Sequence, residues 1–280
     1  MAPIVTRRER ASIHHQKEWA YSHSMRIARF TLHDRPTYGV LEDGSERLVV
    51  LDGDPLFGGT KPTGQIAALD EVRLLSPVIP RSKVIGVADN YRPAGQRQDP
   101  ASHPTCFFKP NTSVIGPDTP VVVPPWADEV HIEAELAVVI KTLAKNVSAA
   151  EAETVILGYT VANDISARDP HTAVGPHAAA KGFDTACPLG PWLVVGSDLD
   201  LTNLTVRARV DGQVWQEGTT ADMVNKIPEL IEYLTGCMTL LPGDVILTGT
   251  PVGQAVARPG QRVEVEVAGV GSLANPVVQR

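Results

Sequence analysis

The chain has 280 residues, of which 43% are hydrophobic and 20% charged, a composition typical of a globular protein with one large domain or two smaller ones. Its net charge of -7 argues against nucleic acid or an anionic membrane as the main partner, and no window approaches the roughly 18 apolar residues of a membrane-spanning helix. The three cysteines lack CxxC spacing, which fits a reducing compartment and gives no sign of a disulfide framework or a zinc site. We therefore interpret the protein as soluble and cytoplasmic.

The first 24 residues differ in character from the rest of the chain. They carry four basic residues against two acidic ones, and they contain neither apolar periodicity nor the apolar centre of a signal peptide. We interpret residues 1–24 as a disordered extension. Residues 25–80 contain short strand-like stretches and turns, with a hairpin signal at Glu42-Asp43-Gly44, and are predicted to form a small N-terminal β subdomain.

Residues 81–280 are predicted to form a second, larger domain that is also mostly β. Short apolar strands recur between prolines and glycines, and few helices are indicated. One helix opens with a capping box at Ser148 and ends near Gly158, and another has Pro228 in its first turn and Gly236 past its end. No P-loop or G-x-G-x-x-G motif follows a strand, so nucleotide phosphate binding has no support. The predicted fold class is mostly β with a few helices, in the α+β class.

The stretch VHIEAELAVVI at residues 130–140 contains two glutamates in an otherwise apolar strand pattern. Glu133 and Glu135 are two residues apart, so in an extended chain both side chains project from one face. Two like charges beside apolar chain are costly unless a counter-charge neutralises them. Asp164 adds a third carboxylate where the apolar run YTVAN ends, and an all-oxygen set of donors selects Mg²⁺, Mn²⁺ or Ca²⁺ over Zn²⁺. The alternative is a strand whose glutamates face solvent, which is how we interpret VEVEV at 263–267.

A series of short motifs follows in order from residue 83 to the C-terminus. They are NY, FFKP, IEAELAVVI, GYTVANDISARD, KGFDTACPLGPW, PGDVILTGTPVG and GVGSLANPVV. In this order they resemble the fumarylacetoacetate hydrolase family. The resemblance implies a β-roll or mixed β-sandwich fold around one metal ion, often in a homodimer. It also implies a small oxo- or dioxo-acid substrate that is hydrolysed, decarboxylated or isomerised.

The resemblance also implies roles for individual residues. Glu133, Glu135 and Asp164 match the family's metal ligands, with Mg²⁺ as the expected ion and Mn²⁺ or Ca²⁺ as the alternatives. Lys181 matches a lysine that faces the substrate beside the metal. Its ammonium would offset carboxylate or enolate charge, which makes Lys181 the first candidate catalytic residue.

Five further residues complete the site that the resemblance implies. Arg168 matches a pocket arginine, although a structural ion pair with the aspartate that follows it is an alternative. Thr250 matches a hydroxyl that contacts the substrate carboxylate, with a turn-forming role as its alternative. Asn90 and Tyr91 are expected to line the substrate pocket. His171 stands where the family has glutamine, and we assign it to catalysis with Lys181 and Arg168.

The sequence departs from the family in the segment that follows the NY motif. Members that activate water carry a His-Glu pair there, but Ala94 and Arg97 stand at the two positions in this chain. Both halves of the usual base are therefore missing. His103 and His177 are near enough in sequence to act as substitutes, although a single histidine on a loop is more often a surface residue.

Three functions are open from the sequence. The first is a metal-dependent enzyme that breaks a C–C bond of an oxo- or dioxo-acid, by hydrolysis or decarboxylation, through a stabilised enolate. The second is an isomerase or tautomerase of such an acid. The third is a non-catalytic metal-stabilised binding protein, which the missing base favours and the carboxylates with Lys181 disfavour.

Overall fold

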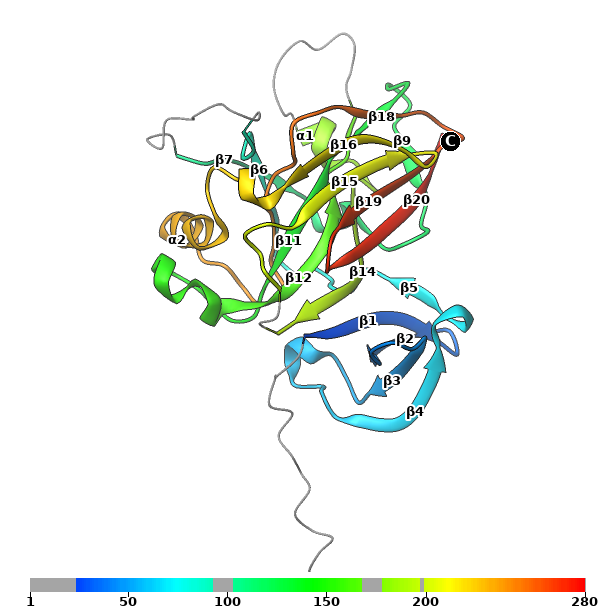
Figure 1. Ribbon diagram of the computed structural model, residues 1–280. Helices are drawn as coiled ribbons and strands as arrows, with labels where there is room; N and C mark the ends of the chain where they lie inside the picture. The colour runs from blue at the N-terminus through cyan, green and yellow to red at the C-terminus, as the bar shows by residue number, and fades with distance from the viewer. Residues whose placement is uncertain (1–23, 93–102, 168–177, 197–198, 280) are drawn as a thin grey trace, which may run out of the picture.

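The computed structural model describes residues 24–92, 103–167, 178–196 and 199–279. Its strands form three sheets, of 12, five and three strands, and short helices lie around them (Figure 1). The large sheet runs in the order β4-β3-β2-β1-β14-β12-β11-β17-β6-β7, with β5 beside β1 and β8 beside β14. Most neighbours are antiparallel, but β17 with β6 and β14 with β8 are parallel. The prediction of a mostly β chain with few helices is confirmed.

The strands have the following bounds: β1 (Met25–Leu32), β2 (Arg35–Leu41), β3 (Arg47–Leu51), β4 (Pro62–Ala68), β5 (Arg73–Leu75), β6 (Val84–Ala88), β7 (Thr105–Lys109), β8 (Val114–Ile115), β9 (Val121–Val123), β10 (Val130–Ile132), β11 (Ala134–Ile140), β12 (Ile156–Asn163), β13 (Ser166–Ala167), β14 (Cys187–Val195), β15 (Thr205–Val210), β16 (Gln213–Thr219), β17 (Val245–Leu247), β18 (Ala255–Ala257), β19 (Arg262–Val267) and β20 (Gly271–Gln279). The described α-helices are α1 (Ala178–Gly182) and α2 (Ile227–Cys237). The described 3₁₀ helices are η1 (Pro55–Phe57), η2 (Leu69–Glu71), η3 (Asn111–Ser113), η4 (Ala149–Val155) and η5 (Thr220–Asp222).

The N-terminal strands are continuous with the large sheet. β1 to β4 form a meander whose β2–β3 connection contains the predicted turn, with Gly44 at a φ of 68°. β1 also pairs with β14, through Met25 with Val195 and Ile27 with Leu193. In Figure 1 these strands, coloured blue to cyan, lie below the main body. The predicted division at residue 80 stays a prediction, and both parts contribute strands to one sheet.

The central strand β11 is buried on both faces. Leu136, Val138 and Ile140 belong to the largest apolar cluster, which also includes side chains from β15, β19 and α2. Ala137 and Val139 point the other way, into a cluster with side chains from β6, β14 and β17. Successive side chains of β11 enter two different apolar clusters, so neither face of the strand is exposed to water. Burial of a charged residue in this strand therefore costs free energy unless other groups compensate the charge.

Two helix ends differ from the prediction. The capping interaction at Ser148 is present, since the Glu151 carboxylate accepts from the Ser148 hydroxyl at 2.7 Å, but the helix is 3₁₀ and ends at Val155. The following apolar residues enter β12, because pairing with β11 buries them. Pro228 lies in the first turn of α2 as predicted. Gly236 lies inside α2 rather than beyond it, where its carbonyl accepts from Lys145 Nζ at 2.9 Å.

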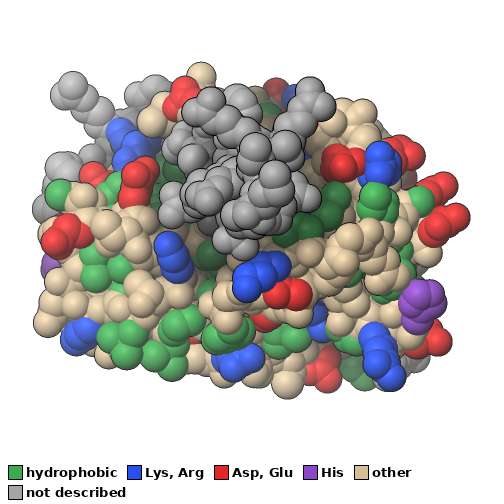
Figure 2. All heavy atoms as spheres, turned by 90° about the horizontal axis from the view of Figure 1, so that it is seen from below, with side chains coloured by type: hydrophobic (Ala, Val, Ile, Leu, Met, Phe, Trp, Pro, Cys, Tyr) green, Lys and Arg blue, Asp and Glu red, His purple; other side chains and the backbone are tan. Residues whose placement is uncertain are grey.

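The surface has an ordinary mixture of side chains where it can be seen. Figure 2 shows acidic and basic residues interspersed with apolar ones over the visible described part of that face. Isolated apolar side chains on such a surface are normal in globular proteins. In the described part of the chain, no helix is long and apolar enough to cross a membrane.

A chain that starts at Met25 is expected to keep its fold. The first strand begins at this residue, and its pairing with β2, β5 and β14 uses only residues from 25 onward. The predicted disordered extension, apart from Ser24, lies outside the described residues. Thermal denaturation of the truncated chain should show stability within about 0.5 kcal/mol of the full chain. Aggregation or a large drop in melting temperature would mean that the extension packs against the fold.

Candidate metal centre

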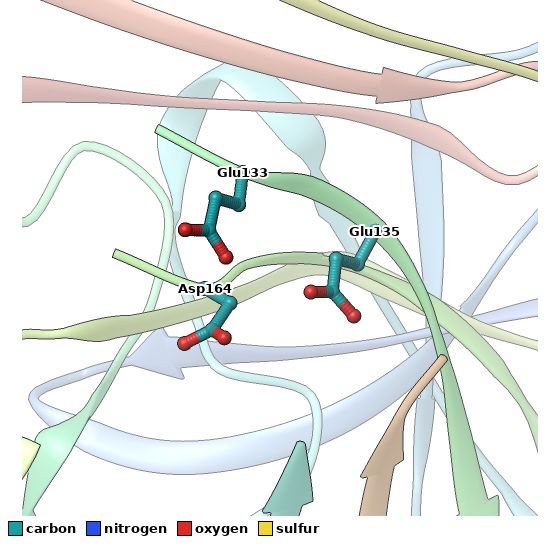
Figure 3. A group of neighbouring side chains, drawn as sticks. All are labelled: Glu133, Glu135 and Asp164. Carbon is teal, nitrogen blue, oxygen red and sulfur yellow. The ribbon is translucent and has the colours of Figure 1, made fainter. Parts of the chain in front are cut away.

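The three predicted carboxylates meet where β11 begins and β12 ends. Glu133 directly precedes β11, Glu135 is its second residue, and Asp164 directly follows β12. Because Ala134 pairs with Asn163 in an antiparallel register, these two strand ends lie side by side. One oxygen atom from each carboxylate lies within 4.8 Å of the others, and Figure 3 shows the three groups turned toward a common space.

Glu133 marks a change of sheet. The strand expected over residues 130–140 is interrupted at this residue, because β10 pairs in the three-stranded sheet while β11 belongs to the large sheet. The Glu133 N–H donates to the Asn163 side-chain oxygen at 3.1 Å, and its carbonyl accepts from the Asp164 N–H at 3.0 Å. The two glutamates still converge on Asp164, although they do not share one regular strand.

Two lysines contact Asp164, one at each of its carboxylate oxygens. Lys181 in α1 donates to Asp164 Oδ2 and to Glu133 Oε2, both at 2.6 Å. Lys109, at the end of β7, donates to Asp164 Oδ1 at 2.5 Å and to the Ile165 carbonyl at 3.2 Å. Lys181 is 8% exposed and its ammonium lies 5.1 Å from the centre of the Phe107 ring, whereas Lys109 is 1% exposed.

The charges in the site do not balance. Burial alone would raise the pKa of Asp164, but the ammonium groups of Lys109 and Lys181 outweigh burial and lower it. Burial alone would lower the pKa of Lys181, but Asp164 and Glu133 outweigh it and raise the pKa. The pKa of Glu133 is raised by burial and then by Asp164, and the pKa of Glu135 is raised further by burial and by both neighbouring carboxylates. Among the described residues, three carboxyl groups therefore face two ammonium groups, and Glu135 is the least compensated.

The predicted pocket residues Asn90, Tyr91 and Thr250 lie near the carboxylates. Asn90 is buried, and its amide donates to the carbonyl oxygens of Thr248 and Asn225 at 2.8 and 3.0 Å. Tyr91 is 5% exposed, and burial, followed by the Glu135 carboxylate, raises the pKa of its hydroxyl. The Thr250 hydroxyl lies 2.8 Å from the Ala134 carbonyl oxygen, to which it can donate. Their assignment to substrate binding stays a prediction.

Several predicted residues lie outside the described part of the chain. These are Arg168, His171 and His177, together with Ala94 and Arg97 at the positions of the missing base. His103 is described, and it is exposed. Its ring stacks on Tyr233 of α2, with 5.5 Å between ring centres.

Lys109 also belongs to the site, although no role for it was predicted from the sequence. The motif FFKP was recognised only as part of the resemblance, and its lysine received no role. The signal was the alternation of β7, because Phe107 and Lys109 point inward while Phe108 is 54% exposed. A lysine at an inward position of an apolar strand requires a buried carboxylate partner, which is Asp164 here.

The residues fit a divalent cation. All three carboxylates offer oxygen donors, which are the ligands that Mg²⁺ and Mn²⁺ accept. In the described part of the site the three carboxyl groups outnumber the two lysines by one, so a cation would relieve the repulsion around Glu135.

Comparison with known proteins identifies relatives over nearly the whole described chain. The family model for the fumarylacetoacetate (FAA) hydrolase C-terminal domain matches residues 83–278, and the Rv2993c-like N-terminal model matches residues 25–77. The crystal structure of 5-carboxymethyl-2-hydroxymuconate delta-isomerase from Mycobacterium smegmatis is 44% identical, with a TM-score of 0.83, and the match covers 91% of this chain and 100% of that one. The human mitochondrial oxaloacetate tautomerase FAHD2A is 40% identical over 220 residues, which are 74% of this chain and 70% of the human protein.

A more distant structure contains a metal ion. Maleylpyruvate hydrolase from Sphingobium sp. SYK-6, in complex with manganese(II) and pyruvate, is 28% identical with a TM-score of 0.76, and the match covers 91% of this chain and 99% of that one. The resemblance of the motifs, the fold of the neighbours and the match of the family model over most of the chain agree. The chain belongs to the fumarylacetoacetate hydrolase family.

Proposed function

We propose that this protein is a divalent-metal-dependent tautomerase or isomerase of a small oxo-acid. The observation that carries the proposal is the convergence of Glu133, Glu135 and Asp164 with the Lys181 ammonium 2.6 Å from two of them. Relatives at 40–44% identity are named as a tautomerase and an isomerase, which favours this function over hydrolysis. Mg²⁺ as the resident metal and a homodimeric assembly are further proposals from the family resemblance.

Lys181 would stabilise the negative charge that develops on the substrate. When bound, a divalent cation supplies a Lewis acid that polarises the substrate carbonyl. The ammonium of Lys181 stays protonated beside two carboxylates, so it acts as a fixed positive charge and a hydrogen-bond donor to an enolate oxygen. Lys181 is 8% exposed, so little water competes with the substrate for its ammonium. Burial therefore strengthens the attraction between the ammonium and an enolate oxygen.

Cleavage of a C–C bond is the second candidate function. It is favoured by the fold similarity to maleylpyruvate hydrolase, whose structure holds manganese(II) and pyruvate. Decarboxylation passes through the same type of enolate and requires no activated water, whereas hydrolysis requires a base to deprotonate water. The two kinds of cleavage are therefore separable by experiment.

The proposal is tested by measuring three reactions of the wild-type protein with Mg²⁺ or Mn²⁺. Conversion of enol to keto oxaloacetate is followed by absorbance, and pyruvate release reports decarboxylation of oxaloacetate or hydrolysis of an acylpyruvate. The same metal without protein, and the variant Glu135→Gln, serve as controls for uncatalysed reaction. Tautomerisation well above both controls supports the proposal. Metal-dependent cleavage without tautomerisation would select the second function, and no turnover at all would select a metal-stabilised binding protein.

Restoring the missing base should change one reaction more than the others. The double substitution Ala94→His with Arg97→Glu, at positions outside the described residues, is expected to raise acylpyruvate hydrolysis by at least about tenfold, because a positioned base contributes roughly 10²–10⁴-fold. Tautomerisation and decarboxylation should change less, since they rely on enolate stabilisation. Wild-type hydrolysis that is already fast, and that is lost in His103→Ala or His177→Ala, would instead identify a substitute base.

A further inference from the structure

A short segment after β17 runs along the start of β11 and contacts a metal ligand. We call residues 248–251 the strap. The Thr248 N–H and hydroxyl both donate to the Leu136 carbonyl, at 3.1 and 2.9 Å. The next N–H, that of Gly249, donates to Glu135 Oε2 at 2.6 Å. This hydrogen bond orients the Glu135 carboxylate, the least compensated of the three. The position of the strap therefore helps to fix the position of Glu135.

Asn90 fastens the first end of the strap. Its amide nitrogen donates to the Thr248 carbonyl at 2.8 Å and to the Asn225 carbonyl at 3.0 Å. Its amide oxygen accepts from the Asn225 backbone and side-chain nitrogens at 2.9 and 3.1 Å. An asparagine amide has two donor hydrogens and two acceptor positions, and all four are used. Asn90 therefore has no hydrogen-bonding capacity left for a substrate.

Gln216, from the five-stranded sheet, fastens the other end. Its amide nitrogen donates to the Pro251 carbonyl at 2.6 Å. Its amide oxygen accepts from the Ala134 N–H at 3.3 Å. The Thr250 hydroxyl, 3.1 Å from the same oxygen, can donate its single hydrogen either to it or to the Ala134 carbonyl. Gln216 is 2% exposed, so these hydrogen bonds are shielded from water and costly to lose.

Gly249 has no room for a side chain. Its φ is +93°, in the region that favours glycine, and a Cβ atom there would lie 2.8 Å from the Asn90 Cβ and 3.1 Å from the Val87 carbonyl oxygen. The glycine therefore allows the strap to approach Asn90 closely while its N–H points at Glu135. An alanine at this position would push the strap away from Asn90.

We propose that Asn90 and Gln216 are positioning residues that hold the strap, and through it Glu135, in the geometry needed for cation binding. The inference rests on the proposed metal centre and deepens it. It reassigns Asn90, for which the family resemblance implies contact with substrate. Residues that orient a metal ligand through a second hydrogen bond typically change metal affinity by 10–100-fold when removed.

The experiment is calorimetric titration of metal-free protein with Mn²⁺. Asn90→Ala and Gln216→Ala are each expected to raise the Kd for Mn²⁺ by about tenfold or more, and Gly249→Ala should do the same from within the strap. Asn275→Ala is the matched control, because Asn275 is equally buried and its amide donates to the carbonyls of Gly116 and Thr119 at 3.0 and 2.9 Å. The control should lose thermal stability without a change in the Kd.

The possible results distinguish failure of the positioning role from failure of the metal centre. Unchanged Mn²⁺ affinity in folded Asn90→Ala and Gln216→Ala would overturn the positioning role of these two residues. A raised KM with unchanged kcat and Kd in Asn90→Ala would instead assign Asn90 to substrate binding. A wild-type protein that binds no Mn²⁺ would overturn both the metal centre and the positioning role. If Asn90→Ala does not fold, Gln216→Ala and Gly249→Ala decide the result. A lowered kcat with a raised Kd in those variants supports the proposal.

Discussion

Replacing Glu135 by glutamine is expected to stabilise the metal-free protein and to remove tight metal binding. Glu135 is 2% exposed, and its pKa is raised well above the usual value by burial and then by Asp164 and Glu133. Glutamine keeps an oxygen that can accept from the Gly249 N–H but carries no charge. Because burial and the neighbouring carboxylates disfavour ionisation of Glu135, replacing it should raise the free energy of unfolding at neutral pH by about 1–3 kcal/mol in the presence of a chelator.

Bound metal should offset the stabilising effect of the same substitution. Loss of a direct ligand is expected to weaken Mn²⁺ binding by at least about 100-fold. This is more than the effect expected from removing a residue that only orients a ligand by a hydrogen bond. Wild-type protein at a Mn²⁺ concentration of about 100 times its Kd gains about 2.7 kcal/mol of stability, and Glu135→Gln should gain almost none. The stability advantage of Glu135→Gln over wild type, measured with chelator, should therefore shrink by about 2 kcal/mol or more when Mn²⁺ replaces the chelator.

The control for Glu135→Gln is Glu264→Gln in β19. Glu264 lies in the alternating run that we interpreted as solvent-facing, and its carboxylate accepts from Arg209 at 2.9 Å while 38% of its side chain is exposed. A partly exposed ion pair contributes about 0–1 kcal/mol, so the control should change little under either condition. An equal stabilisation by Mn²⁺ of wild type and Glu135→Gln would contradict the assignment of Glu135 as a ligand.

The two lysines on Asp164 are expected to give different defects when each is replaced by methionine. Lys181→Met should remain folded at reduced stability, because its ammonium is also paired with two carboxylates, and should lose roughly 10²–10³ in kcat, because it removes the donor to the developing enolate. Lys109→Met should instead lower the free energy of unfolding by about 3–5 kcal/mol, because it removes one partner from a fully buried ion pair. Steady-state kinetics with saturating Mn²⁺ and urea denaturation measure the two effects.

The comparison of the two lysines also has a clear contrary outcome. Both variants lose one positive charge beside the same carboxylate, so any effect of net charge alone should be similar in both. Wild-type kcat in Lys181→Met would remove this residue from catalysis. If Lys109→Met is as stable as the wild type, then the ion pair between Lys109 and Asp164 does not contribute to the stability of the fold.

The sequence was sufficient to find the carboxylates, but their exact setting depended on tertiary structure. The spacing of Glu133 and Glu135, with Asp164 at the end of an apolar run, predicted an all-oxygen group, and the structure brings the three together. The break in the strand at Glu133 could not be predicted, because it results from a change between two sheets. A local pattern reports periodicity within a segment, whereas sheet membership depends on residues far away in the chain.

The hydrogen-bonding partners in the site were even less accessible from sequence. Asn90 and Gln216 are far apart in the chain, and only the fold brings their amides to opposite ends of the strap. The end of the 3₁₀ helix at Val155 was also missed, because the residues after it are buried by pairing with β11 rather than by a helix face. In both cases a long-range contact decides the outcome.

The pairing of β1 with β14 limits how this protein can be shortened. Residues 193–195 of β14 use their backbone groups to pair with residues 25–27, and Ile27 and Leu193 share one apolar cluster. A fragment that began after the N-terminal meander would keep the carboxylates and both lysines but leave this stretch of strand with an open apolar edge. Such an edge is a template for pairing with another polypeptide. The N-terminal strands therefore cover a strand edge of the larger part of the fold, even though they contribute none of the candidate metal ligands.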